Sequence, residues 1–131
     1  MSNFESEQPL VLVVDDEREV LDEVMAVLSK ASFACCCCTS SQEAMAAVQA
    51  TPPHLILCDV NLQGESGLEL CEQITQLPGL EEVPVMFLSG AQLPDIIRRS
   101  FASGGIYCLR KPFDPDVLVE LIDQAIGVPE A

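Results

Sequence analysis

The chain has 131 residues, enough for one domain with a single core but not for two. Its formal net charge is −15, which argues against a direct nucleic-acid partner because phosphate backbones are bound by Lys and Arg. No apolar run reaches the length of a membrane span, and the first residues lack the basic and apolar regions of a signal peptide. We therefore expect one cytoplasmic domain without membrane insertion.

Five short apolar runs predict β-strands, because each is bounded by turn-forming or polar residues. In chain order, the expected strands cover residues 10–14, 33–38, 55–58, 84–88 and 106–109. The first of them is rich in valine, which is typical of a strand that is buried on both faces of a sheet.

A helical pattern follows each expected strand. Ser40 and Glu43 form a capping box for the second helix, and Asp114 with the next proline opens the last helix, which Gly127 ends. The fourth helix, expected over 94–102, has a shorter apolar stripe than the others.

Strict alternation of five strands and five helices is typical of βαβ units. Such units cross over right-handed and give an α/β fold with a parallel sheet and helices on both of its faces. We expect this domain to cover residues 9–127, between a loose N-terminal tail, 1–8, and a C-terminal tail, 128–131.

Four of the seven cysteines are consecutive, Cys35 to Cys38. Neighbouring residues of a strand point to opposite faces, so these thiols cannot easily form disulfides with one another or converge on one tetrahedral ion. We expect them to act as small buried apolar residues in a reducing compartment.

Polar side chains follow four of the five expected strands. They are, in chain order, Asp15 with Asp16, Asp59, Ser89 and Lys111. Because the carboxyl ends of parallel strands lie at one edge of the sheet, we expect these residues to meet in one cleft. Each close pair of carboxylates repels by roughly 1 to 4 kcal/mol. The cluster therefore calls for a hard divalent cation, with Lys111 supplying further positive charge.

These residues, in this order and at this spacing, resemble the receiver domain of two-component response regulators. The matching segments are Val13–Glu17, Cys58–Leu62, Gly67, Ser89–Gly90 and Tyr107–Phe113. The resemblance covers about residues 9–127. It implies a flavodoxin-like fold with a five-stranded sheet in the order 2-1-3-4-5, and a phosphoryl group taken from a sensor histidine kinase or a His phosphotransfer protein.

The resemblance also implies which residues hold the metal and the phosphoryl group. Asp59 would be the phospho-acceptor and would share in binding Mg²⁺ (or Mn²⁺). Asp16 would be a direct ligand of the ion, and Asp15 would act on it mainly through water. The backbone carbonyl of Asn61 would complete the coordination that the protein provides.

Four further residues receive roles in the same way. Ser89 would donate a hydrogen bond to a phosphoryl oxygen, and Lys111 would pair with the phosphoryl group. The peptide bond before Pro112 would be cis. Tyr107 matches the aromatic residue that changes position when the domain switches.

The output surface implied by the resemblance consists of the helix over 94–102, the strand over 106–109 and the last helix. It would act on a downstream protein partner or an effector domain. Arg98 and Arg99 form a basic pair there, for which a solvated face and an acidic partner are the two interpretations. Gln63 stands where many family members have proline, so the loop around it is expected to be more mobile.

Two other functions compete with this one. A Mg²⁺-dependent phosphohydrolase with an aspartate nucleophile would need an acid two residues after the nucleophile, where this chain has Asn61. An interaction module that kept the fold and is not phosphorylated is the other alternative. Intact Asp16, Asp59 and Lys111 argue against it.

Overall fold

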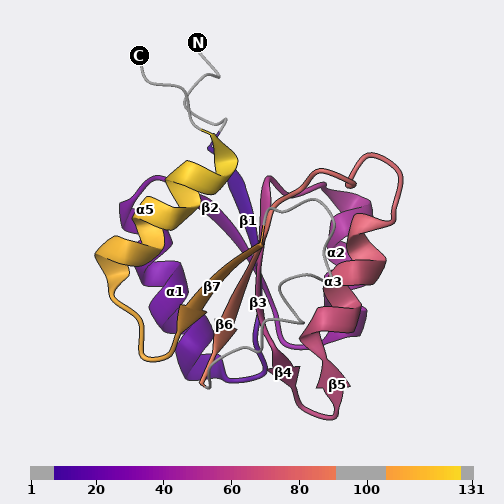
Figure 1. Cartoon of the computed structure of the whole chain (residues 1–131), viewed down its shortest axis with the longest axis horizontal. Coiled ribbons are helices and arrows are strands. Elements are labelled where there is room, and N and C mark those ends of the chain that lie inside the picture. Colours follow the sequence, from indigo (N-terminus) through magenta and orange to yellow (C-terminus); the bar gives the residue numbers. More distant parts are fainter. Residues whose placement is uncertain (1–7, 91–105, 128–131) are drawn as a thin grey trace.

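A computed structural model describes residues 8–90 and 106–127. Five parallel strands form one sheet in the order β2-β1-β3-β6-β7 (Figure 1). These strands are β1 (Leu10–Val14), β2 (Ala34–Cys38), β3 (Leu55–Asp59), β6 (Val85–Ser89) and β7 (Ile106–Arg110). Counting the five strands of this sheet along the chain, the order is 2-1-3-4-5, so the predicted flavodoxin-like fold is confirmed.

Helices cover both faces of the sheet. α1 (Arg18–Lys30) and α5 (Pro115–Ile126) lie on one face, and α2 (Ser41–Ala50) and α3 (Gly67–Thr75) lie on the other (Figure 1). Within the described residues, no helix combines the length and the apolar character that crossing a bilayer requires. The helix expected over 94–102, with Arg98 and Arg99, lies outside the described residues, as do both expected tails apart from Gln8.

The helix ends follow from their capping residues. The Ser40 side chain accepts a hydrogen bond from the backbone N–H of Glu43, as the capping box predicts. The Glu43 carboxylate in turn accepts from the backbone N–H of Thr39, one residue before the cap. Asp114 caps α5, and Gly127 ends it with a left-handed φ of 71°.

The central strands are apolar on both sides because they separate two cores. In β1, Val11 and Val13 pack toward α1 and α5, whereas Leu12 and Val14 pack toward α2 and α3. β3 and β6 alternate in the same way. Continuous apolar runs, rather than alternating ones, are therefore what this sheet requires.

The cysteine run forms the edge strand β2, beside β1. Cys35 and Cys37 face the core under α1 and α5, and Cys36 and Cys38 face the other core. None of the seven cysteines, all of which lie within the described residues, forms a disulfide. Burial, with a smaller contribution from neighbouring thiols, raises the pKa of Cys35 to about 11 and that of Cys38 to about 12. These thiols are therefore protonated near neutral pH, in keeping with the predicted role as small apolar residues.

The segment expected to be a loop after β3 contains a small hairpin. β4 (Asn61–Leu62) pairs antiparallel with β5 (Glu65–Ser66), so that Asn61 lies opposite Ser66. Gly64 in the turn has a φ of +73°, a left-handed conformation that glycine adopts without strain. Strands of two residues show no periodicity in a sequence, which is why the sequence predicts only a loop here.

Candidate functional site

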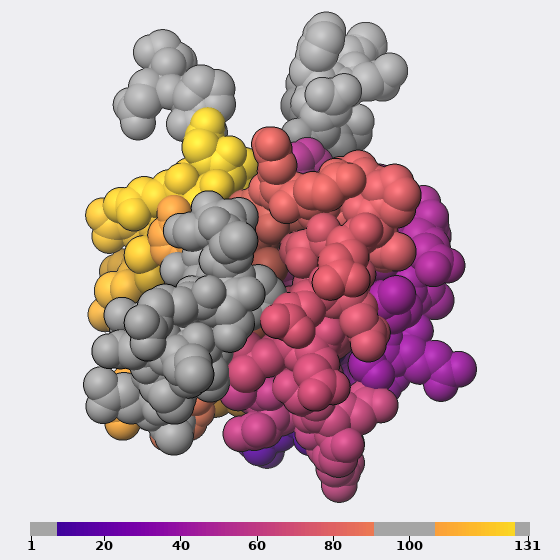
Figure 2. All heavy atoms as spheres, turned by 45° about the vertical axis from the view of Figure 1, so that its right-hand side comes forward, coloured from indigo at the N-terminus to yellow at the C-terminus, as the bar shows by residue number. Residues whose placement is uncertain are grey.

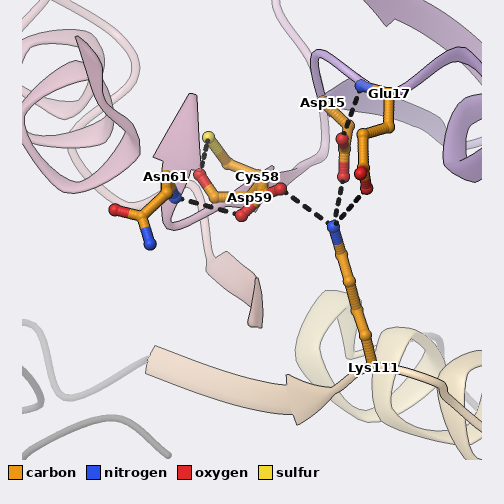
Figure 3. A network of polar contacts seen from close by, with 6 residues as sticks. All are labelled: Asp15, Glu17, Cys58, Asp59, Asn61 and Lys111. Carbon is orange, nitrogen blue, oxygen red and sulfur yellow. Dashed lines mark hydrogen bonds and ion pairs between the residues drawn. The ribbon is translucent and has the colours of Figure 1, made fainter. Parts of the chain in front are cut away.

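Side chains from three strand ends meet at the carboxyl edge of the sheet (Figure 3). Asp15 follows β1, Asp59 is the last residue of β3, and Lys111 follows β7. The Nζ atom of Lys111 lies 2.9 Å from Oδ2 of Asp15 and 2.8 Å from Oδ2 of Asp59. The expected meeting of strand ends is therefore confirmed for these three residues.

Both aspartates are more enclosed than a carboxylate at a strand end ordinarily is. Asp59 was expected just beyond its strand but belongs to it, and only 8% of its surface is exposed. Asp15 is fully buried, and its Oδ1 atom accepts a hydrogen bond from the backbone N–H of Glu17. Burial raises the pKa of the Asp15 carboxyl, and this hydrogen bond and Lys111 only partly oppose the effect. The site thus holds negative charge at an energetic cost.

Lys111 supplies the positive charge that offsets this cost. Partial burial alone lowers the pKa of its ammonium group. The hydrogen bonds to Asp59 and Asp15 outweigh burial and raise the pKa above its ordinary value. Lys111 is therefore a permanent cation at physiological pH, and it bridges two neighbouring strand ends.

Glu17 also belongs to this cluster, although no role was predicted for it from the sequence. Its Oε1 atom lies 3.5 Å from Nζ of Lys111. Glu17 occupies the cap position of α1, but its side chain makes no capping hydrogen bond and instead turns toward the lysine (Figure 3). The signal that could have found it is its place at the end of the acidic run that follows β1.

Three carboxylates of the cluster fit a hard divalent cation. One oxygen each from Asp15, Glu17 and Asp59 lie within 4.8 Å of one another. Oxygen ligands with net negative charge suit Mg²⁺. Asp16, expected to be a direct ligand, is half-buried and lies outside this group, so its role stays a prediction.

The chain turns away sharply after Asp59. The backbone N–H of Asn61 donates to Oδ1 of Asp59 at 3.0 Å, while the Asn61 side chain points away from the carboxylate (Figure 3). The backbone N–H of Gly67 donates to the carbonyl of Val60. A Cβ atom at Gly67 would collide with the backbone carbonyl oxygen of Asp59, so the close approach requires glycine.

The remaining expected site residues lie on the neighbouring strands. Ser89 is buried at the end of β6, which pairs with β3, and its carbonyl accepts from the backbone N–H of Lys111. Tyr107 lies half-buried on β7 and packs against the core under α1 and α5. The peptide bond between Lys111 and Pro112 is cis. What Ser89 and Tyr107 do toward a phosphoryl group stays a prediction.

Comparisons with known proteins agree with this architecture. Residues 11–123 match the response regulator receiver domain. The chain is 30% identical over 118 residues to the DNA-binding transcriptional regulator NtrC of Salmonella typhimurium, covering 90% of this chain and 25% of that protein. It is 29% identical to the phosphate regulon transcriptional regulatory protein PhoB of Pseudomonas aeruginosa, over 83% of this chain and 48% of PhoB.

A solved structure supports the same fold. The chemotaxis protein CheY4 of Vibrio cholerae superposes with a TM-score of 0.83 at 24% identity, and the match covers 90% of this chain and 98% of CheY4. The chain spans about a quarter of the length of the NtrC proteins that it matches.

Proposed function

The chain belongs to the family of response regulator receiver domains, and from this premise we propose that it is a phosphorylation-dependent signalling switch. Asp59 takes a phosphoryl group from a sensor histidine kinase or a His phosphotransfer protein. The domain catalyses its own phosphorylation and dephosphorylation and no other reaction. Its cysteines form no disulfide within the described residues, which suits the reducing cytoplasm, where we place it.

The contact between Lys111 and Asp59 is the observation that carries this proposal. It brings a permanent cation to within 2.8 Å of a nearly buried carboxylate oxygen. A phosphoryl group bound to that carboxylate would bring further negative charge to the same place. Lys111, already beside this oxygen, would pair with the phosphoryl group.

The transfer itself uses the carboxylate as a nucleophile. An oxygen of Asp59 forms a bond to phosphorus as the bond between phosphorus and the donor's imidazole nitrogen breaks. The electron pair of that bond stays on the nitrogen, which takes up a proton from solvent. Asp15, Glu17 and Asp59, with the carbonyl of Asn61, would hold Mg²⁺, and Asp16 would join them directly. When bound, Mg²⁺ neutralises charge on the phosphoryl oxygens.

The conformational change would begin with the side chains that the phosphoryl group attracts. Lys111 continues directly from β7, so its movement toward the phosphoryl group would act on that strand and on Tyr107 within it. Ser89, on the neighbouring strand, would donate its hydroxyl to another phosphoryl oxygen. Within the described residues, the altered surface is that of β7 and α5. Its target is a protein partner or an effector domain, rather than nucleic acid, because the chain is strongly acidic.

Incubation with Mg²⁺ and acetyl phosphate, followed by intact mass measurement, tests the proposal. We expect one added phosphoryl group on the wild-type chain and none on Asp59→Asn. Repeated hydrolysis of phosphomonoesters without a lasting adduct would instead indicate a phosphohydrolase. The absence of any adduct at every Mg²⁺ concentration would indicate an interaction module that is not phosphorylated.

A further inference from the structure

The β4–β5 hairpin is tied to the start of α2 by one carboxylate. Oε1 of Glu65 accepts a hydrogen bond from the Ser41 hydroxyl at 2.7 Å and a longer one from the Ser41 backbone N–H at 3.4 Å. Ser41 is the first residue of α2. The positive end of the helix dipole therefore also favours a carboxylate at this point.

The same hairpin fixes the backbone beside the acceptor. Asn61 pairs with Ser66, the neighbour of Glu65, and its own N–H donates to Asp59. Ser66 in turn caps α3 by accepting from the backbone N–H of Glu69. A displacement of Glu65 would therefore pass through the strand pair to the Asn61 backbone.

The tip of the hairpin, Gln63 to Glu65, is exposed. It projects from the body of the molecule (Figure 2). Beside it lies an open hollow of about 680 Å³, lined in part by Ser41, Leu62, Glu65 and Glu69. Leu62 anchors the hairpin inward, being buried in the core. The exposed contact between Glu65 and Ser41 is a second tie, which joins the hairpin to α2.

We propose that Glu65 and Ser41 are positioning residues that hold the Asn61 carbonyl in place for a divalent cation. This inference rests on the proposed function, in which that carbonyl is a ligand. Neither residue touches the reacting atoms. Breaking their contact should weaken cation binding while every ligand stays present, and phosphorylation should slow at low Mg²⁺ but recover at saturating Mg²⁺.

The test is a Mn²⁺ titration followed by the electron paramagnetic resonance signal of the free ion. We expect Glu65→Ala and Ser41→Ala each to raise the Kd for Mn²⁺ about fivefold, which corresponds to roughly 1 kcal/mol. The double variant should be no weaker than either single one, because both remove the same contact. Glu65→Gln and Ser41→Thr keep an acceptor and a hydroxyl, respectively, and should stay within about twofold of wild type.

Glu69→Ala is the matched control, since it removes one acidic side chain from the same hollow. An equal rise of Kd in Glu69→Ala would attribute the effect to charge alone and overturn the inference. Alanine variants of Glu65 and Ser41 that bind Mn²⁺ as wild type does would also overturn it, while phosphorylation of wild type would leave the proposed function standing. A wild-type chain that neither binds Mn²⁺ nor takes a phosphoryl group would overturn both.

Discussion

The two sides of Asp59 are built in different ways. On one side lie Asp15 and Lys111, whose charged side chains extend from the ends of β1 and β7 and are largely enclosed. On the other side lies the backbone of Asn61, in a hairpin whose outer contact is exposed. Changes on the first side should therefore alter the stability of the fold. Changes on the second should alter the position of a ligand at little cost in stability.

The largest expected effect is on the enclosed side. Lys111→Met removes the cation between Asp15 and Asp59 and leaves their buried carboxylates to repel each other. We expect the free energy of unfolding in metal-free buffer to fall by about 3 kcal/mol, the lower end of the range for breaking a buried ion pair. Urea unfolding followed by circular dichroism measures it.

Lys30→Met is the matched control for this variant, since Lys30 is an exposed lysine at the end of α1. It should change the unfolding free energy by less than about 0.5 kcal/mol. Lys111→Met should also bind Mn²⁺ more tightly than wild type, because the ammonium no longer competes for the carboxylate oxygens. Equal stability of Lys111→Met and wild type would show that the enclosed side does not depend on its cation.

Gly67→Ala tests the point where the two sides join. A Cβ atom there would meet the Asp59 carbonyl, which is backbone and cannot move aside alone. We expect a loss of about 2 kcal/mol in unfolding free energy, as for other overpacked positions. Gly90→Ala, whose Cβ would meet nothing within 4 Å, is the control. A Gly67→Ala variant as stable as Gly90→Ala would contradict the close approach.

Asp15→Asn should stabilise the protein. Burial raises the folded-state pKa of Asp15 above its ordinary value of 3.8, so the protonated form favours folding. As pH rises through 3.8 and then through the folded-state pKa, wild type loses stability that Asp15→Asn keeps. We expect an advantage of about 1 kcal/mol at neutral pH, the usual size of a single-residue effect, because the asparagine side chain brings no charge into the buried site. It should disappear at acidic pH.

Unfolding curves at several pH values measure this difference. Asp123→Asn, which removes an exposed acid from α5, controls for the loss of one charge. A stability gain for Asp15→Asn that does not vary with pH would show that ionisation of Asp15 is not its cause.

The smallest expected stability effect is that of Glu65→Ala. Its hydrogen bonds to Ser41 are exposed, and such contacts contribute less than about 1 kcal/mol to folding. Urea unfolding of this variant should nearly match that of wild type, even where Mn²⁺ binding is weakened. If Glu65→Ala lowered the free energy of unfolding as much as Lys111→Met does, the two sides of Asp59 would not differ in their contribution to stability.

The sequence predicted the enclosed side well, for a physical reason. The apolar runs locate the strands, and parallel strands bring their carboxyl ends to one edge, so Asp15, Asp59 and Lys111 had to approach one another. The apolar pattern locates strands and their ends, but it does not show in which direction a polar side chain points. Glu17 joined the cluster because of how its side chain turns from the cap position of α1.

The β4–β5 hairpin and its contact with α2 could not be predicted from the sequence in this way. β4 and β5 are each two residues long, too short for a period to be visible. Glu65 and Ser41 lie 24 positions apart and meet through exposed side chains that no apolar pattern relates. The resemblance to receiver domains assigned a role to the Asn61 carbonyl, but the contact that holds the hairpin became visible only in three dimensions.

The most direct test of the central claim is to identify the residue that carries the phosphoryl group. The wild-type chain is treated with acetyl phosphate and Mg²⁺ and then reduced with borohydride, which converts an aspartyl phosphate to homoserine. Peptide mass analysis then locates the converted residue. We predict homoserine at position 59 and at no other aspartate. Conversion at Asp15 or Asp16, with Asp59 intact, would contradict the account.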